Sequence, residues 1–377
     1  VVYITTPADG IAGQLTSKFV IERRDKYDNS TEEGSSVITL TINDAEKSAH
    51  SSNKVPANSN NGWAYKVGYG YKDEDQNFIE LVKIPYEGTP SVVGGADYVK
   101  SRGAFWFIDK MSSVPKDEDG RPGRWEIRSH LGETFTTYYY LLINPDQTNQ
   151  VYFDNPKRVL TAGTPKQKGI GYVDFEAELN DNFNNPTYST ATCVIDLTTD
   201  RQPSPVNDAY GFSASTITKQ TAQPTGGFVT VITSVTIPLN AYYTTFYYLD
   251  TNASERYDNT KPEIKGKARW SISEGKQEVD IVGADITRTA FTKSYQGELI
   301  AGTTSGQIWF ETQDSYANPS PVVQTEKFDL SSNSVGWKKF YSPGYGWTES
   351  TGNAKMVLDE KTTFFLYLDT KVSTPTF

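Results

Sequence analysis

Hydrophobic and polar residues alternate along short stretches of this chain. The most regular stretches share a period of two and end in aspartate: Phe105–Asp109, Phe246–Asp250 and Phe365–Asp369. A period of two places successive side chains on opposite faces of a half-buried β-strand. No long stretch combines a helical period with helix caps. The pattern therefore predicts an all-β protein, and the 29 glycines and 19 prolines suit the many turns that short strands require.

A turn of the form Asp-x-aromatic-x-Asn follows an alternating strand three times. The copies are Asp25–Asn29, Asp181–Asn185 and Asp314–Asn318. Asp and Asn side chains bond nearby backbone N–H groups in turns. We therefore interpret Asp25, Asn29, Asp181, Asn185, Asp314 and Asn318 as hairpin markers. A calcium site at these loop carboxylates is the alternative, but one carboxylate per turn supplies too few oxygens without other partners.

The turns define a threefold internal repeat. A glycine precedes each turn aspartate, at Gly13, Gly163 and Gly302, by 12, 18 and 12 residues respectively. The chain of 377 residues suits two or three domains of roughly 100–150 residues each. We expect three tandem immunoglobulin-like β-sandwich domains, at residues 1–128, 129–272 and 273–377, with a long insertion in the first.

This order of elements resembles the immunoglobulin-like repeats of large bacterial surface proteins, such as S-layer proteins and invasin- or intimin-like adhesins. The residues that carry the resemblance are the turn Asp181–Thr187 and the strands Thr233–Pro238 and Thr245–Thr251. The resemblance implies an extracellular, cell-surface location and a structural or adhesive role without catalysis.

Charge and composition exclude several other classes. The net charge of −10 and the pI of about 4.9 argue against nucleic-acid binding, which needs clustered Lys and Arg. No apolar run reaches the ~18 residues that a membrane-spanning helix needs. The single cysteine, Cys193, rules out an intrachain disulfide and is expected in the core. The start at Val1, without an initiating Met, is interpreted as processed or excised.

Two acidic loops in the first repeat are candidates for calcium, the one cofactor that the sequence suggests. They contain Asp73 and Asp75, and Asp117 and Asp119. Glu126, the nearest equivalent of the bidentate glutamate of a calcium loop, falls within a predicted strand. Solvated loops are the alternative interpretation of both segments.

No enzymatic motif is present. The two histidines, His50 and His130, lie in polar segments, and the chain has no Gly-x-Ser-x-Gly, His-Glu-x-x-His or P-loop motif. We therefore predict that the protein is not an enzyme.

Aromatic residues cluster in two segments rich in polar residues and glycine. The candidates for contact with sugar or protein are Trp63 and Tyr65 in the first repeat and Trp337, Tyr341, Tyr345 and Trp347 in the third. Tyr and Trp are enriched at contact surfaces. The alternative is that these rings cover the ends of the sandwich.

The third repeat is expected to lack its closing strand. The first two repeats are predicted to close with strands at Trp125 and Trp270, but only eight residues follow Asp369. An unpaired sheet edge is normally avoided. Either the chain is a fragment whose next residues supply the strand, or a neighbouring subunit donates one.

The sequence thus predicts a structural segment of an S-layer or related extracellular assembly that self-associates with like subunits. An adhesin or carbohydrate-binding stalk, with cell-wall or other polysaccharide as its partner, is the alternative. Neither hypothesis includes nucleic acid or a membrane span.

Overall fold

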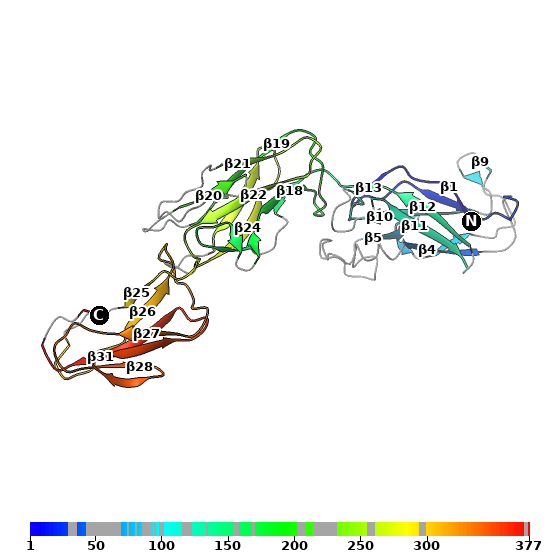
Figure 1. Ribbon diagram of the computed structural model, residues 1–377. Coiled ribbons are helices and arrows are strands. Elements are labelled where there is room, and N and C mark those ends of the chain that lie inside the picture. The colour runs from blue at the N-terminus through cyan, green and yellow to red at the C-terminus, as the bar shows by residue number, and fades with distance from the viewer. Residues whose placement is uncertain are drawn as a thin grey trace.

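The computed structural model of the protein describes most of the chain, and every regular element in the described part is a β-strand. The described residues are 1–28, 36–42, 69–73, 75–79, 81–84, 92–93, 96–97, 102–114, 123–132, 135–153, 158–167, 170–201, 209–214, 232–254, 261–293, 299–372 and 376–377. The prediction of an all-β protein is confirmed. The strands form three groups that follow one another along the molecule (Figure 1), and we call them the first, second and third units.

The first unit has two main sheets, with strand orders β1-β3-β10-β5-β6 and β12-β11-β4-β7. Short pairs join β2 to β13 in parallel and β8 to β9. The strands are β1 (Val2–Thr5), β2 (Gly10–Ile11), β3 (Phe19–Glu22), β4 (Ser36–Ile42), β5 (Tyr69–Lys72), β6 (Phe78–Ile79), β7 (Leu81–Ile84), β8 (Val92–Val93), β9 (Ala96–Asp97), β10 (Arg102–Asp109), β11 (Trp125–Leu131), β12 (Phe135–Leu141) and β13 (Ile143–Asn144).

The second unit repeats this plan, with strand orders β14-β18-β22-β20 and β15-β24-β23-β19-β21. A short hairpin joins β16 and β17. The strands are β14 (Gln150–Phe153), β15 (Arg158–Thr161), β16 (Lys166–Gln167), β17 (Gly171–Tyr172), β18 (Phe175–Asn180), β19 (Cys193–Thr199), β20 (Tyr210–Ser213), β21 (Ser234–Ile237), β22 (Tyr243–Asp250), β23 (Glu263–Ala268) and β24 (Gly275–Val282).

The third unit has one complete sheet, β25-β26-β31-β28-β29, and a pair, β27-β30. The strands are β25 (Arg288–Lys293), β26 (Ile308–Gln313), β27 (Glu326–Leu330), β28 (Lys338–Ser342), β29 (Gly346–Glu349), β30 (Gly352–Met356) and β31 (Thr362–Asp369). In the first unit β4 pairs with β11, and in the second β19 pairs with β23. No strand of the described chain takes this place beside β27. Among the described residues, β27 pairs with β30 alone.

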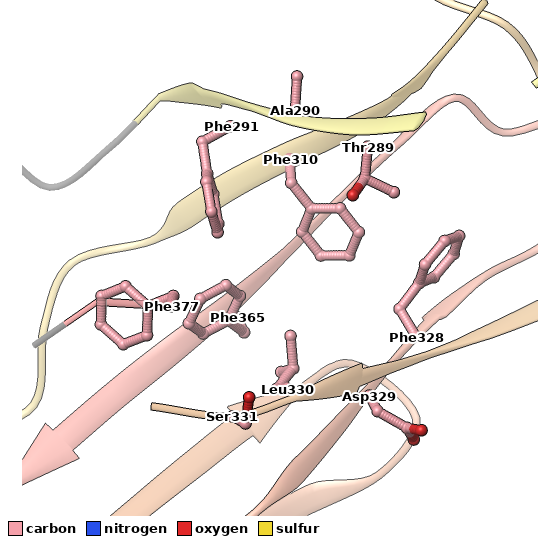
Figure 2. Close-up of a pocket in the computed structure, with 10 residues that line it drawn as sticks. All are labelled: Thr289, Ala290, Phe291, Phe310, Phe328, Asp329, Leu330, Ser331, Phe365 and Phe377. Carbon is pink, nitrogen blue, oxygen red and sulfur yellow. The ribbon is translucent and has the colours of Figure 1, made fainter. Parts of the chain in front are cut away.

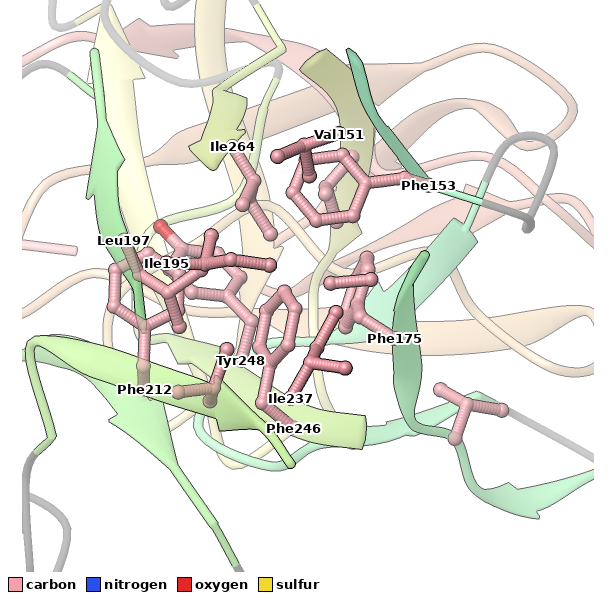
Figure 3. Close-up of a cluster of buried hydrophobic side chains, with 14 of the residues drawn as sticks. Val151, Phe153, Phe175, Ile195, Leu197, Phe212, Ile237, Phe246, Tyr248 and Ile264 are labelled. Carbon is pink, nitrogen blue, oxygen red and sulfur yellow. The ribbon is translucent and has the colours of Figure 1, made fainter. Parts of the chain in front are cut away.

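Each unit has its own hydrophobic core. The core forms because alternate residues of the central strands point inward: β10 and β31 bury every second side chain up to the final aspartate. Equivalent rings meet in the first two units, where Phe19 stacks on Phe105 and Phe175 on Phe246. Figure 3 shows the core of the second unit, with Phe175 and Phe246 among residues from both sheets. Cys193 is fully buried there, as expected.

Two details differ from the sequence-based expectations. Residue 128 falls inside β11, which pairs along its length with β12, so both strands belong to the first unit. The strand predicted at Trp270 is wrong, because residues 269–272 form bends between β23 and β24. The strand that closes the second unit is β23, whose buried positions are Ile264, Gly266 and Ala268. Because this strand contains two lysines and a glycine, its sequence does not show a clear alternation of apolar and polar residues.

Candidate functional site

The turn Asp181–Asn185 is held together by one carboxylate. Oδ1 of Asp181 accepts hydrogen bonds from the backbone N–H groups of Phe183 (2.8 Å) and Asn185 (2.9 Å). Oδ2 accepts from the side-chain Nδ2 of Asn185 at 2.8 Å. Asn184 has a φ of +62°, a left-handed conformation that Asn tolerates. The interpretation of these residues as turn markers fits this geometry, since the carboxylate binds the turn's own donors.

The same turn also joins the first and second units. The Asn185 side chain, which is buried, donates from Nδ2 to the carbonyl of Lys110 (2.7 Å) and accepts at Oδ1 from the N–H of Ser112 (2.9 Å). Lys110 and Ser112 directly follow the last residue of β10. Oδ2 of Asp181 also accepts from the N–H of Asp146, in the segment that connects the units, at 2.9 Å. One turn thus binds the preceding unit and the connecting segment together.

The junction of the second and third units repeats these bonds at equivalent positions. Asn318 donates to the carbonyl of Thr251 (2.8 Å) and accepts from the N–H of Ala253 (2.9 Å). Oδ1 of Asp314 accepts from the N–H groups within its turn, and its Oδ2 accepts from the N–H of Ala284 in the connecting segment (2.9 Å). Two junctions with the same donors and acceptors indicate a repeated structural device.

The aromatic residue of each turn packs on a glycine of the preceding unit. A Cβ atom added to Gly13 would lie 2.2 Å from the Phe183 ring, and one added to Gly163 would lie 2.3 Å from the Tyr316 ring. Both glycines have a φ of +75°, which favours glycine independently. In the first two repeats, the glycine that precedes the turn is therefore the surface on which the next unit's aromatic ring rests.

On the side of the preceding unit, the aspartate that ends the central strand holds the backbone in place through hydrogen bonds. Oδ1 of Asp109 accepts from the N–H of Met111, and Oδ1 of Asp250 accepts from the N–H of Asn252. The carbonyl of each aspartate accepts from the N–H of the glycine, Gly13 at 2.6 Å and Gly163 at 2.8 Å. These bonds fix the glycine and the segment after the aspartate in one surface.

We call the Asp-x-aromatic-x-Asn segment the joint turn. We call the glycine, together with the three residues after the strand-ending aspartate, the joint surface. The joint surfaces are Gly13 with Lys110–Ser112, Gly163 with Thr251–Ala253, and Gly302 with Thr370–Val372. The turn motif can be recognised in the sequence, but its hydrogen bonds to the preceding unit cannot. The backbone groups that Asn185 and Asn318 bind lie 65 to 75 residues away in the chain.

A buried ion pair supports the joint surface of the second unit. The Arg201 guanidinium donates to both carboxylate oxygens of Asp250, at 2.8 and 2.9 Å, and both side chains are almost fully buried. Tyr248 donates to the same carboxylate at 3.0 Å. Burial raises the pKa of the Asp250 carboxyl, and the Arg201 guanidinium opposes that shift. No motif or repeat in the sequence pointed to Arg201.

Of the four acidic candidates for calcium, the structure describes Asp73 and Asp75. Asp117 and Asp119 lie outside the described residues. Asp73 accepts from the backbone N–H of Asn77 at 2.8 Å and so closes the hairpin turn between β5 and β6, in which Asp75 also lies. In the part of the chain that the structure describes, no three His, Cys, Asp or Glu side chains gather where they could hold a metal ion.

The aromatic candidates of the third unit share one sheet face. Trp337, Tyr341 and Trp347 alternate with the buried Phe340, and the rings of Tyr341 and Trp347 lie 5.5 Å apart across the β28–β29 pair. Tyr345 lies in the turn between these strands, and Trp63 and Tyr65 lie outside the described residues. The face continues onto β31, whose outward residues Phe364, Leu366 and Leu368 are half-buried. We call this face the aromatic face.

A groove lies in the third unit, with β25 on one side and β27 on the other. Its volume is about 230 Å³, and Figure 2 shows its lining of rings from both sheets, including Phe310, Phe328 and Phe365. Phe377 enters it and packs edge-on against Phe365 and Tyr367. Of the rings that line it, Phe310 and Phe365 are buried, whereas Phe291 and Phe377 are exposed.

Comparison with known proteins gives fold likenesses at low similarity. No protein-family model and no curated protein matches the chain. Among solved structures, the Escherichia coli adhesin FdeC is 10% identical with a TM-score of 0.28, and the alignment covers 96% of this chain and 94% of that one. Domains 4–9 of the surface layer protein SbsC are 11% identical with a TM-score of 0.22, covering 97% of this chain and 39% of that one.

Invasin, a bacterial integrin-binding protein, is 9% identical with a TM-score of 0.27, covering 97% of this chain and 53% of that one. These structures include the kinds of surface protein that the sequence resembles. At such TM-scores the likenesses carry no assignment of function to this chain. Separately, the described chain contains no helix of the length and apolarity needed to cross a bilayer.

Proposed function

We propose that this chain is a non-catalytic structural segment of an extracellular cell-surface assembly, of the S-layer or a related type. In this proposal it consists of three tandem immunoglobulin-like domains, which correspond to the three units. Because β12 and β13 belong to the first unit and the connecting segments contain Asp146 and Ala284, we place the limits near residues 145 and 284. Its assigned partners are like subunits.

The observation that supports this proposal is the repeated joint. At both junctions one buried asparagine binds a carbonyl and an N–H of the preceding unit, and one aromatic ring rests on its glycine. Buried, paired polar groups are costly to separate, since each would lose its partner. A chain whose units are fixed end to end in this way acts as a stiff spacer, which suits a lattice or a stalk more than a catalyst.

Small-angle X-ray scattering tests the stiffness. The scattering of the intact chain should fit a single extended conformation, and the double variant Asn185→Ala/Asn318→Ala should require a broad ensemble of unit orientations. The matched control is Asn182→Ala/Ser315→Ala, which alters exposed positions of the same two turns. A wild-type curve that already requires freely jointed units would contradict the proposal. Electron microscopy of the purified protein then separates ordered sheets or filaments, expected for an assembly subunit, from dispersed rods.

The alternative function is an adhesin or carbohydrate-binding stalk, and the aromatic face favours it. Trp337 is 48% exposed and Trp347 is 44% exposed. Lys339 lies 4.4 Å from the Trp337 ring and 3.2 Å from Glu349, so ionic groups flank the rings. Flat rings beside polar groups can stack on sugars. Retention on a polysaccharide column that is lost in Trp347→Ala, but kept in the control Tyr172→Ala on the second unit, would favour this function.

Calcium stays a prediction, with Asp73, Asp75, Asp117 and Asp119 as its candidates. Isothermal titration with calcium tests it directly. The oxygens of Asp73 already bind Asn77, so calcium there would have to compete with the hairpin turn.

A further inference from the structure

The first unit has a joint turn and the third unit has a joint surface, and these are the two halves that each internal joint brings together. We infer that a second copy of this chain docks head to tail, with the first-unit joint turn of one copy on the third-unit joint surface of the other. The inference goes beyond the proposed function, which requires only the two internal joints. Its contacts would be those of Phe183 on Gly13 and Tyr316 on Gly163, repeated by Tyr27 on Gly302.

The joint surface of the third unit already has the geometry of the other two. The N–H of Gly302 donates to the carbonyl of Asp369 at 2.7 Å, and the N–H of Lys371 donates to its Oδ1 at 2.9 Å. Gly302 has a φ of +85°. Within the described chain, no atom lies within 4 Å of the position that a Cβ would take there, whereas aromatic rings fill this space at Gly13 and Gly163. Val372 is 89% exposed beside it.

The joint turn of the first unit is likewise formed over residues 25–28, and Asn29 lies outside the described residues. Oδ1 of Asp25 accepts from the N–H of Tyr27 at 2.8 Å, and the carbonyl of Asp25 accepts from the N–H of Asp28 at 3.1 Å. Asp28 has a φ of +69°, matching Asn184 and Ala317 at the same turn position. The Tyr27 ring is 72% exposed, in contrast to the half-buried Phe183 and Tyr316.

Complementary halves at opposite ends make a heterologous contact, which adds copies in a row unless the rotation closes a ring. The intermolecular joint would be weaker than the internal ones for a structural reason. In the first two units the glycine segment also binds a strand that comes after the closing strand in the chain: Ala12 donates to the carbonyl of Asn144 in β13, and Ala162 donates to the carbonyl of Val282 at the end of β24. The described third unit has no counterpart of that strand. We therefore expect reversible, concentration-dependent association.

Sedimentation equilibrium of the intact chain tests this inference. The average mass should rise above the 42.0 kDa of one chain as concentration increases. Tyr27→Ser removes the ring, and Gly302→Asn fills its space with a residue that tolerates a positive φ. Each variant should weaken association roughly thirtyfold, the loss expected for an anchoring side chain. Tyr345→Ser, which removes a 41% exposed ring from the β28–β29 turn, is the matched control and should associate like wild type.

Mixing the two variants gives the sharper result. Tyr27→Ser keeps its joint surface and Gly302→Asn keeps its joint turn, so the mixture should form a one-to-one complex and stop at a dimer. Thermal unfolding of each variant checks that it is folded. The inference is overturned if wild type stays monomeric up to millimolar concentration, if neither variant alters association, or if the mixture does not pair. None of these outcomes affects the scattering test of the internal joints. Head-to-tail docking can therefore be refuted without refuting the proposed function, and the reverse also holds.

Discussion

The side chain of Asn185 and the backbone of Ser112 lie 73 residues apart in the chain and are joined by a 2.9 Å hydrogen bond between two units. The same asparagine belongs to the tight turn that Asp181 closes. The local turn and the contact between the two units therefore both depend on Asn185. A change in the turn is expected to alter the relative orientation of the units as well as the stability of one of them.

The equivalent residue at the second junction provides a direct test. Asn318→Ala removes the hydrogen-bond acceptor of the buried Ala253 N–H and one of the two donors to Oδ2 of Asp314. The free energy of unfolding of the third unit should fall by about 2 kcal/mol, because a buried polar group left unpaired costs ~1–3 kcal/mol. Differential scanning calorimetry measures this change. Ser315→Ala, an exposed change in the same turn, should leave the transition in place, and equal effects of the two variants would contradict the assigned role.

Substitution of two equivalent glycines distinguishes the cost of backbone strain from the cost of a clash with the aromatic ring. Gly163→Ala introduces a methyl group at a φ of +75° and against the Tyr316 ring. Gly302→Ala has similar strain but meets no neighbour within 4 Å in the described chain. Each should lose roughly 1 kcal/mol to strain, and Gly163→Ala should lose a further ~1–3 kcal/mol through overpacking. Chemical denaturation of the two variants gives the difference, and equal losses would show that the ring contact is unimportant.

The Arg201–Asp250 pair predicts a pH-dependent variant. Arg201→Leu leaves a buried carboxylate unpaired and should cost about 3–5 kcal/mol at neutral pH. Arg201 is the largest influence that opposes the effect of burial on Asp250, so its removal raises the pKa of this carboxyl further, and the folded state binds the proton more tightly than the unfolded state. The stability of the variant should then fall as pH rises from about 4 to 7. Denaturation of the second unit across this range measures the effect. The double variant Arg201→Leu/Asp250→Asn should lose this dependence, and a pH-independent cost would count against the assignment.

His130 predicts acid sensitivity in the first unit. Its ring nitrogens bond the hydroxyls of Thr41 and Thr136, each at 2.8 Å. Burial, with the nearby Arg128 charge, lowers the His130 pKa below its ordinary value. The unfolded state therefore takes up a proton first, so this stabilisation is complete above about pH 6.5 and decreases as pH falls. Comparing wild type with His130→Gln should show a slope in the wild type, of at most about 1.4 kcal/mol per pH unit, that the variant lacks. Parallel slopes would refute the prediction.

Local patterns predicted the strands well where one face of a strand is apolar. The strands at Phe105–Asp109, Phe246–Asp250 and Phe365–Asp369 all occur, with the aspartate buried in each. The closing strand of the second unit was misplaced, because β23 buries a glycine and an alanine between lysines, and neither gives a strong apolar signal. Burial of small residues depends on the opposite sheet, which a local pattern does not contain.

By itself the sequence determined the all-β class, the repeat frame and the turn motif, because each depends on residues close together in the chain. Only the tertiary structure showed that Asn185 and Asn318 cross to the preceding unit, that Gly13 and Gly163 lie under aromatic rings, and that Arg201 binds Asp250. These contacts join segments tens of residues apart, and their geometry exists only after the sheets have packed. The physical reason is that a turn's own hydrogen bonds fix its shape, while its remaining donors and acceptors bind whatever surface folding brings against it.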